Sequence, residues 1–377
     1  MRLTATRAGL AGALAGLLIG AGAVLAYGAL RAGAEPESAS APAAPASAIA
    51  TAEVAGPAEF EAVGRWLAAE AEADRFSGVV LVARGDQVLL RQAHGLADRS
   101  LGAAFAPDTR VRIASVTKQF TAAAILKLQD EGVLKVSDPV CRWIRPCPDA
   151  WAPVTLHHLL THTSGVRELL RQPDYALRSQ EPATPRQLTA ATAALPLDFE
   201  PGSRFRYNNA GYNLLGDVIE RATGESYGAH LERVFFKPLG MGNTTLDTGR
   251  SVVPGLAQGY DGAAALPRWR DHSVIFAAGG LISTADDLLT WTHALHAGKV
   301  VSPAALAQML GRDTAAGPFS VRQRRGAGLL YGYGLIRGPA GLLVEPGFAD
   351  EEVYHTGSWA GFRNIVAHAP GAGVTVV

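Results

Sequence analysis

A serine and a lysine stand three residues apart in the run Ser115-Val116-Thr117-Lys118, at the expected start of a helix. At that spacing two helical side chains share a face. A lysine that burial keeps partly neutral can then take the proton of the serine hydroxyl. The N–H groups and the positive dipole end of a helix N-terminus favour a developing oxyanion. The pattern predicts a serine nucleophile with a lysine base, although alone it also fits a capping serine beside an exposed lysine.

A tyrosine and an amide stand two residues apart in the middle of the chain, as Tyr207 and Asn209. In an extended or turning backbone both side chains can point into one site. The phenol could then relay a proton, and the amide could hold a substrate by hydrogen bonds. Taken alone, this Y-x-N pattern more often marks a buried tyrosine near a turn.

The run His355-Thr356-Gly357-Ser358 lies on an expected strand near the end of the chain. A glycine in a strand lets a ligand lie close to the backbone, and a free N–H can bind the reacting carbonyl oxygen. None of the three motifs is specific by itself. Their order along the chain, with the nucleophile early, Y-x-N in the middle and H-T-G late, is what indicates a single hydrolytic site.

The elements around these motifs predict an α/β plus α fold. Apolar residues recur at helical spacing over 115–134, where Gly132 marks the helix end, while 77–98 favours a β-hairpin that turns at 84–86. The middle of the chain is mainly helical, and strand-like runs return in LLYGYGLIRG, EEVYHTGS, FRNIVAHAP and GVTVV. We therefore expect one antiparallel sheet built from both chain ends, flanked by helices, with a mainly helical insertion.

The N-terminus is typical of an exported protein. Arg2 and Arg7 precede an uncharged run over 8–30, and Ala32-Gly33-Ala34 offers small residues for cleavage. Residues 1–34 therefore fit either a signal peptide or a membrane anchor. Residues 35–59, rich in Ala, Pro and Ser, predict a linker, and 60–377 predicts the catalytic domain. We expect the domain in the periplasm or outside the cell.

Composition narrows the range of partners. Hydrophobic residues make up 48% of the chain and charged residues 18%, which is typical of a folded domain, and 34 basic residues balance 34 acidic ones. This balance gives no general reason to expect nucleic acid as a partner, and we expect membrane contact only through the N-terminal segment. The expected partner is a small-molecule or peptide substrate.

Cysteine and histidine usage points to structural roles. Cys141 and Cys147 stand six residues apart between prolines, which in an oxidising compartment predicts a local disulfide. No His or Cys cluster accompanies them, so we expect neither a metal nor another cofactor. His157, His158 and His162 also lack the context of a metal site, and we expect them to be structural.

With the three motifs in this order, the sequence resembles the serine β-lactamase and D-alanyl-D-alanine carboxypeptidase superfamily, in particular its class C-related branch. The resemblance covers about residues 60–377 in the order and spacing of that family. Four longer blocks carry it: ARVRIASVTKQFTAAAILKLQDEGVLKVSDPV, VTLHHLLTHTSGV, PGSRFRYNNAGYNLLGDVIERATGESYGAHLERVFFKPLGMGNTTL and AAGGLISTADDLLTW.

The resemblance implies a role for each motif residue. Ser115 would be acylated with the help of Lys118, and Tyr207 would act as general base or proton relay. Asn209 would hold the amide of the substrate. The remaining roles fall to the late motif: His355 and Thr356 would line the strand edge, Gly357 would keep that edge accessible, and the backbone N–H groups of Ser115 and Ser358 would form the oxyanion hole.

Two departures from the family pattern affect the expected function. Position 355 is histidine where class C β-lactamases carry lysine, which predicts weak, pH-dependent carboxylate binding and favours a peptidase or an esterase. The chain ends at Val377 in mid-strand, without the C-terminal helix that the resemblance implies, so we expect a fragment. The leading hypothesis is an exported serine hydrolase acting on a D-amino-acid peptide, a β-lactam or a small ester. The alternatives are a plain carboxylesterase and a binding or scaffold protein that retains the fold without the chemistry.

Overall fold

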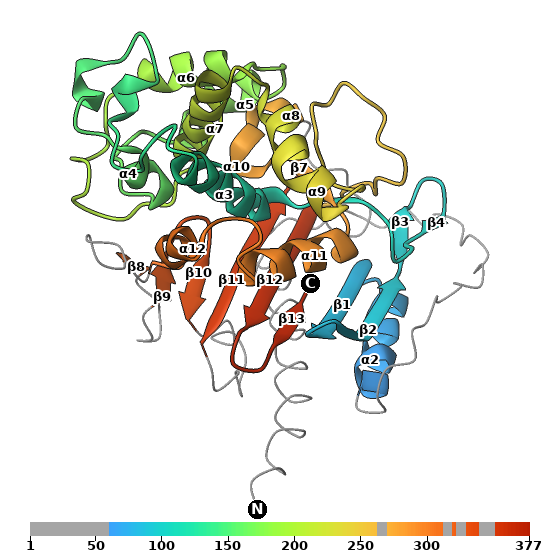
Figure 1. Cartoon of the computed structure of the whole chain (residues 1–377). Helices are drawn as coiled ribbons and strands as arrows, with labels where there is room; N and C mark the ends of the chain where they lie inside the picture. Colours follow the sequence, from blue (N-terminus) through green and yellow to red (C-terminus); the bar gives the residue numbers. More distant parts are fainter. Residues whose placement is uncertain (1–59, 262–269, 312–318, 322–328, 339–350) are drawn as a thin grey trace, which may run out of the picture.

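The computed structural model in Figure 1 describes residues 60–261, 270–311, 319–321, 329–338 and 351–377. The predicted export segment and linker, residues 1–59, lie outside this part of the chain. Within it, no helix combines the length and the apolar character that crossing a membrane requires.

An eight-stranded antiparallel sheet forms the lower layer of the molecule in Figure 1. Its order is β2-β1-β13-β12-β11-β10-β9-β8, and β1 pairs directly with β13. The two ends of the described chain thus meet inside one sheet, which confirms the predicted fold class. The strands are β1 (Gly78–Arg84), β2 (Gln87–His94), β8 (Phe319–Val321), β9 (Leu329–Tyr331), β10 (Ile336–Gly338), β11 (Glu352–Trp359), β12 (Phe362–Ala369) and β13 (Val374–Val376).

The hairpin predicted within 77–98 is present as β1 and β2, with Gly85 in the left-handed region at φ +53° in the turn. The run LLYGYGLIRG, expected as a strand, is instead divided into β9 and β10. Gly334, at φ +69°, makes the turn between them, and a Cβ there would lie 2.5 Å from the carbonyl oxygen of Lys118. Close contact with the helix that carries Lys118 therefore sets this turn.

Alternating side chains of the sheet pack against helices on opposite faces. Val80 and Val82 of β1 join Leu67 of helix α2 (Glu61–Glu72) in one apolar cluster. Leu81 and Ala83 face the other way, against α11 (Ala285–His296). Each side of this part of the sheet is thereby covered.

A mainly helical region lies over the sheet at the top of Figure 1, and α3 (Thr117–Asp130) runs through its core. Phe120 of α3 stacks on Trp291 of α11 with ring centroids 4.0 Å apart, which joins the helical region to the sheet layer. The other helices are α4 (Leu156–Leu160), α5 (Tyr175–Arg178), α6 (Pro185–Ala193), α7 (Asn209–Thr223), α8 (Tyr227–Leu231), α9 (Lys237–Leu239), α10 (Phe276–Gly279) and α12 (Pro303–Met309). Two small sheets complete the fold: β3 (Leu96–Asp98) with β4 (Ala103–Ala104), and β5 (Val111–Arg112) with β7 (Leu281–Ser283) and β6 (Thr245–Leu246).

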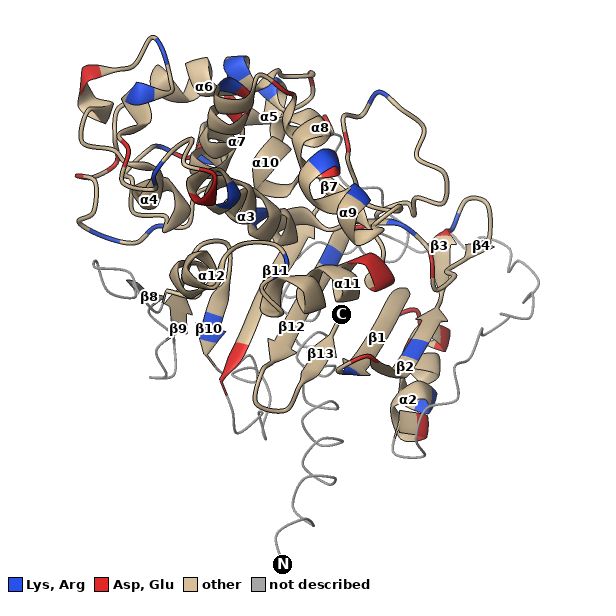
Figure 2. Ribbon diagram, viewed as in Figure 1, with Lys and Arg blue, Asp and Glu red and all other residues tan. Residues whose placement is uncertain are grey.

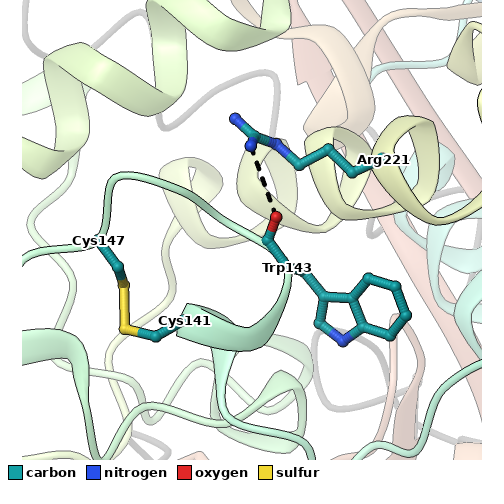
Figure 3. Close-up of a disulfide and its surroundings, with 4 residues drawn as sticks. All are labelled: Cys141, Trp143, Cys147 and Arg221. Carbon is teal, nitrogen blue, oxygen red and sulfur yellow. Dashed lines mark hydrogen bonds between the residues drawn. A yellow bond between two sulfur atoms is a disulfide. The ribbon is translucent and has the colours of Figure 1, made fainter.

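Cys141 and Cys147 form a disulfide that closes a short loop beside α7 (Figure 3). Arg221 of α7 donates a hydrogen bond to the carbonyl oxygen of Trp143 in this loop, at 3.5 Å. The same guanidinium pairs with buried Asp217 on its own helix, at 2.9 Å. The disulfide loop is thus fastened to the helix that begins at Asn209.

Basic and acidic residues are interspersed over the described helices and strands in Figure 2, without a face of one sign in that view. The equal numbers of basic and acidic residues in the sequence are therefore also mixed in space on the described elements.

Candidate active site

Ser115 sits at a sharp change of chain direction between β5 and α3. It lies in a single 3₁₀ turn, η2 (Ala114–Val116), that leads directly into the helix. Ala114 has φ +50°, in the left-handed region that L-residues other than Asn and Asp rarely adopt. This conformation leaves Ser115 half-buried at the helix start while its neighbours Ala114 and Val116 are buried.

The amine of Lys118 is fully buried and has three polar neighbours. Its Nζ lies 3.1 Å from Ser115 Oγ, 2.9 Å from Asn209 Oδ1 and 2.8 Å from the carbonyl oxygen of Ala278. Burial lowers the pKa of Lys118 to about 7, and the carboxylate of Glu168 opposes part of that change. Near neutral pH, a large fraction of Lys118 is thus uncharged and able to accept a proton.

Tyr207 lies over the same amine, with its ring centroid 4.7 Å from Lys118 Nζ. Its hydroxyl is buried and makes no fully formed hydrogen bond within the described part of the chain. Burial raises the pKa of Tyr207, and the nearby Ser115 hydroxyl opposes that rise. The phenol therefore keeps its proton at neutral pH, which favours the predicted role of relay over that of phenolate base.

Asn209 is held at the start of α7 by the residue before it. Asn208 caps the helix by accepting a hydrogen bond from Gly211 N–H at 2.6 Å, and its amide donates to the carbonyl oxygen of Val166 at 2.7 Å. Since Asn209 Oδ1 accepts from Lys118, its Nδ2 hydrogens remain as donors for a substrate. The structure thus brings the first two motifs together around one amine.

Glu168 belongs to this site and was not anticipated. Its side chain is buried, with one carboxylate oxygen accepting from Asn209 N–H at 2.5 Å and the other from Leu170 N–H at 3.1 Å. Its charge favours the protonated form of Lys118. A single glutamate in the loop RELLRQ has no periodicity or partner motif that could have revealed this role from sequence.

His162 lies beneath Tyr207 with ring centroids 4.3 Å apart, and its Nδ1 accepts a hydrogen bond from Asn208 N–H at 3.1 Å. Burial lowers the pKa of His162 well below its usual value, so the ring is neutral. It therefore orients the Y-x-N segment. No group of three or more His, Cys, Asp or Glu in the described part of the chain could hold a metal ion.

His355 is buried, and its Nε2 lies 3.1 Å from the hydroxyl of Tyr331. Burial, helped by the charge of Lys118, lowers the pKa of His355 to about 3. We expected carboxylate binding by His355 to depend on pH near neutrality. That expectation is wrong, because His355 is uncharged throughout the neutral range.

Gly357 is required for close packing against the residue before the turn of Ser115. It is buried, and a Cβ there would lie 2.2 Å from the carbonyl oxygen of Ile113, just before the turn of Ser115. Close packing is thus a reason for glycine at this position, while the role of Gly357 in keeping the edge accessible stays a prediction. Its absent side chain lets β11 approach the nucleophile turn.

The edge of β11 beside this turn is free. β10 pairs with β11 only as far as Tyr354, so within the described residues 355–359 have no strand partner on that side. A cleft of about 410 Å³ lies here, lined by Ser115, Tyr207, Asn209, His355, Thr356 and Ser358 together with apolar Leu170, Ile275, Ile336 and Trp359. All three motifs thus meet in one cleft. The assignment of the Ser115 and Ser358 N–H groups as oxyanion donors stays a prediction.

Comparison with known proteins finds the same fold and similar sequences. The family model described as Beta-lactamase matches residues 63–377. Esterase EstB of Burkholderia gladioli is 33% identical over 296 residues, covering 68% of this chain and 74% of EstB. Penicillin-binding protein 4* of Bacillus subtilis is 28% identical over 312 residues, covering 78% of this chain and 66% of that protein. The crystal structure of a D-stereospecific amidohydrolase from Streptomyces sp. aligns with a TM-score of 0.70 at 28% identity, covering 84% of this chain and 92% of that one.

Proposed function

The chain belongs to the beta-lactamase family and is a serine hydrolase, and from that premise we propose that it forms an acyl-enzyme on Ser115 and hydrolyses small esters with an uncharged leaving group. The observation that carries the mechanism is the 3.1 Å contact between Ser115 Oγ and the buried amine of Lys118. EstB, which is similar over two thirds of this chain, is named as an esterase.

Each group in the cleft has a task in this mechanism. Ser115 Oγ bonds to the acyl carbon as its proton moves to neutral Lys118. The bond to the leaving oxygen then breaks, and the alcohol takes a proton through Tyr207, which is resupplied from the Lys118 ammonium. In the second half of the reaction, water attacks the acyl carbon and gives up a proton through Tyr207 to Lys118. The bond to Ser115 Oγ then breaks as Ser115 regains its proton, which releases the acid.

The preference for an uncharged leaving group rests on His355. The proposal places the leaving group along the His355 end of the free β11 edge. Because the pKa of His355 is about 3, no positive charge from this residue is present there at neutral pH to hold a carboxylate. An alcohol fits this end better than the C-terminal carboxylate of a D-alanyl peptide or the carboxylate of a penicillin.

The free edge of β11 supports a second candidate, a D-amino-acid amide or peptide. An extended amide can hydrogen-bond to an unpaired strand edge, which an ester does less well. A D-stereospecific amidohydrolase is among the similar structures. A binding or scaffold protein without the chemistry is disfavoured, because Ser115, Lys118 and Tyr207 are all present and lie close together.

Turnover of 4-nitrophenyl butyrate, benzylpenicillin and a D-alanyl-D-alanine peptide by the purified chain tests these candidates together. We expect hydrolysis of the butyrate ester, an acyl adduct detectable by intact mass, and little reaction with the two carboxylate-bearing substrates. Ser115→Ala should lower the rate at least about a thousandfold, while Ser203→Ala, which removes an exposed hydroxyl, should leave it unchanged. Full turnover in Ser115→Ala would refute the mechanism, and faster acylation by penicillin than by the ester would refute the proposed substrate.

We further propose that the chain is exported through its N-terminal segment. The disulfide between Cys141 and Cys147 supports this, since such bonds persist in oxidising compartments.

A further inference from the structure

Arg270 is a cation beside the cleft that has no acidic partner among the described residues. Its Cζ lies 5.3 Å from the ring centroid of Trp359, which lines the cleft, and 5.7 Å from that of Tyr175. The side chain is half-buried, and among the described residues it makes neither an ion pair nor a hydrogen bond through its guanidinium. The sequence just before it, over 262–269, contains no Asp or Glu. Most other half-buried arginines in the described part of the chain form an ion pair with a carboxylate, as Arg112 does with Asp247 and Arg221 with Asp217.

Among the described residues, a second donor beside the same guanidinium also lacks a partner. Tyr175 is buried, and within the described part of the chain its hydroxyl makes no hydrogen bond. Buried hydroxyls are normally paired, so an unpaired one is a place where a ligand acceptor can bind. Glu168, whose charge acts on Tyr175, is already occupied by the N–H groups of Asn209 and Leu170.

We propose that Arg270 is a specificity-determining residue that binds a carboxylate on the acyl part of the substrate, with the hydroxyl of Tyr175 as a second donor. This inference rests on the proposed function. The leaving group occupies the His355 end of β11, so the acyl part extends past Ser358 towards Trp359 and Arg270. The substrate class is then a half-ester or an acidic acyl derivative, negatively charged at the acyl end and neutral at the leaving group.

The surroundings of Arg270 favour this use of its charge. Flanking aromatic rings hold a planar guanidinium in place and partly dehydrate it. Its N–H groups can then bind a carboxylate through two parallel hydrogen bonds, a geometry called the fork. Apolar Leu170 and Ile275 also line the cleft, which suits a short methylene chain joining the acyl carbon to the carboxylate. A charged hydrogen bond of this kind corresponds to a preference on the order of tenfold or more.

Matched esters test the proposal. The probes are 4-nitrophenyl half-esters of adipic and suberic acid and their methyl-capped neutral counterparts, which differ only in the terminal charge. We expect kcat/KM to favour the charged member of one pair by about tenfold. Arg270→Gln should abolish this preference, so that the charged and neutral members of each pair react with the same kcat/KM. Arg270→Lys, which keeps the charge and loses the fork, should retain part of it, and the preference should decrease with salt.

Arg171→Gln is the control for general electrostatics. Arg171 is exposed and adjoins Leu170 of the cleft lining, so this substitution removes the same charge close to the cleft. An unchanged charge preference in Arg270→Gln, or an equal loss in Arg171→Gln, would overturn the proposal while leaving the hydrolase function intact.

Measurements of ester binding test the proposed carboxylate site independently of the hydrolase function. In the Ser115→Ala background, calorimetry with the charged and neutral esters reports recognition without turnover. Tighter binding of a charged ester that is lost in the added Arg270→Gln supports the carboxylate site even where hydrolysis is absent. Equal binding of both esters with Arg270 present refutes it.

Discussion

A buried amine can organise a site and still accept a proton if its hydrogen bonds suit the neutral form. Lys118 has three acceptors around Nζ, but a neutral amine has only two hydrogens and one lone pair. With the hydrogens donated to Asn209 Oδ1 and the Ala278 carbonyl oxygen, the lone pair faces the hydroxyl of Ser115. The same three contacts also fit the ammonium, so proton transfer requires no rearrangement of the amine.

The pH dependence of kcat/KM on a neutral ester should follow this lysine. Because Lys118 must be uncharged to accept the serine proton, activity should rise with pH through about 7, the pKa that burial sets. Glu168→Gln removes the negative charge that raises this pKa, so the acid limb should move to lower pH. Profiles of kcat/KM between about pH 5 and 9 measure the acid limb of the wild type and of Glu168→Gln.

The control for this shift is Glu131→Gln, which removes an exposed carboxylate paired with Lys127 on the same helix. It should leave the acid limb in place. A limb that stays put or moves upward in Glu168→Gln would exclude Lys118 as the titrating base.

The residues that sequence predicted and those it missed differ in their local context. Ser115 and Lys118 share a helix turn, and Tyr207 and Asn209 flank a helix cap, so short-range spacing was enough to indicate them. Glu168 and Arg270 lie in loops and act through contacts 41 and 89 residues away along the chain, with Asn209 and Trp359. No local pattern encodes such contacts. The charge of His355 was misjudged because its pKa depends on burial beside Tyr331 and on the charge of Lys118, which only the fold brings close.

At the scale of elements, the packing of β11 on the turn before α3 sets the position of the nucleophile. Ala114 adopts a strained backbone conformation there, and Gly357 offers the space that this turn occupies. The strain at Ala114 persists because the strand and the helix confine the turn from both sides.

Gly357→Ala should therefore damage both stability and activity. Its Cβ would lie 2.2 Å from the Ile113 carbonyl oxygen, so the turn must shift. We expect the free energy of unfolding to fall by about 1–3 kcal/mol, as in other overpacked sites, and kcat/KM on the neutral ester to fall by about a hundredfold as Ser115 moves. Urea unfolding and steady-state kinetics measure the two effects.

Gly242→Ala is the matched control, because nothing lies within 4 Å of a Cβ at that position. It should be neutral in both assays. Normal activity and stability in Gly357→Ala would show that the turn is loosely held.

Periodicity predicted most elements, and contact between elements explains the exception. The hairpin of β1 and β2 and the helix α3 follow from the spacing of apolar residues within single segments. The division of LLYGYGLIRG into β9 and β10 follows from Gly334 lying against the backbone of Lys118, more than two hundred residues earlier in the chain. A uniform strand-like composition does not reveal such a turn.

At the scale of the whole molecule, the site lies where two layers meet. The helical region supplies Ser115, Lys118 and Asn209, while the sheet supplies the edge of β11. The sheet itself is closed by pairing of β1 with β13, so strands from opposite ends of the chain support the strand that forms the cleft. Relative movement of the two layers would separate the nucleophile from its substrate-binding edge.

The disulfide stabilises this assembly at a distance from the chemistry. It closes a loop of seven residues, which by chain entropy alone corresponds to about 2 kcal/mol. Arg221 fastens that loop to α7, the helix that begins with Asn209 (Figure 3).

Replacing Cys141 and Cys147 together by serine should lower the free energy of unfolding by about 2 kcal/mol. Because Asn209 keeps its own cap and its contacts with Glu168 and Lys118, kcat/KM at 25 °C should stay within about twofold. Urea unfolding of the double variant, compared with the reduced wild type, measures the stability change. An equal loss in both, with unchanged kinetics, is the expected result, whereas a large fall in kcat/KM would show that the loop controls the position of Asn209.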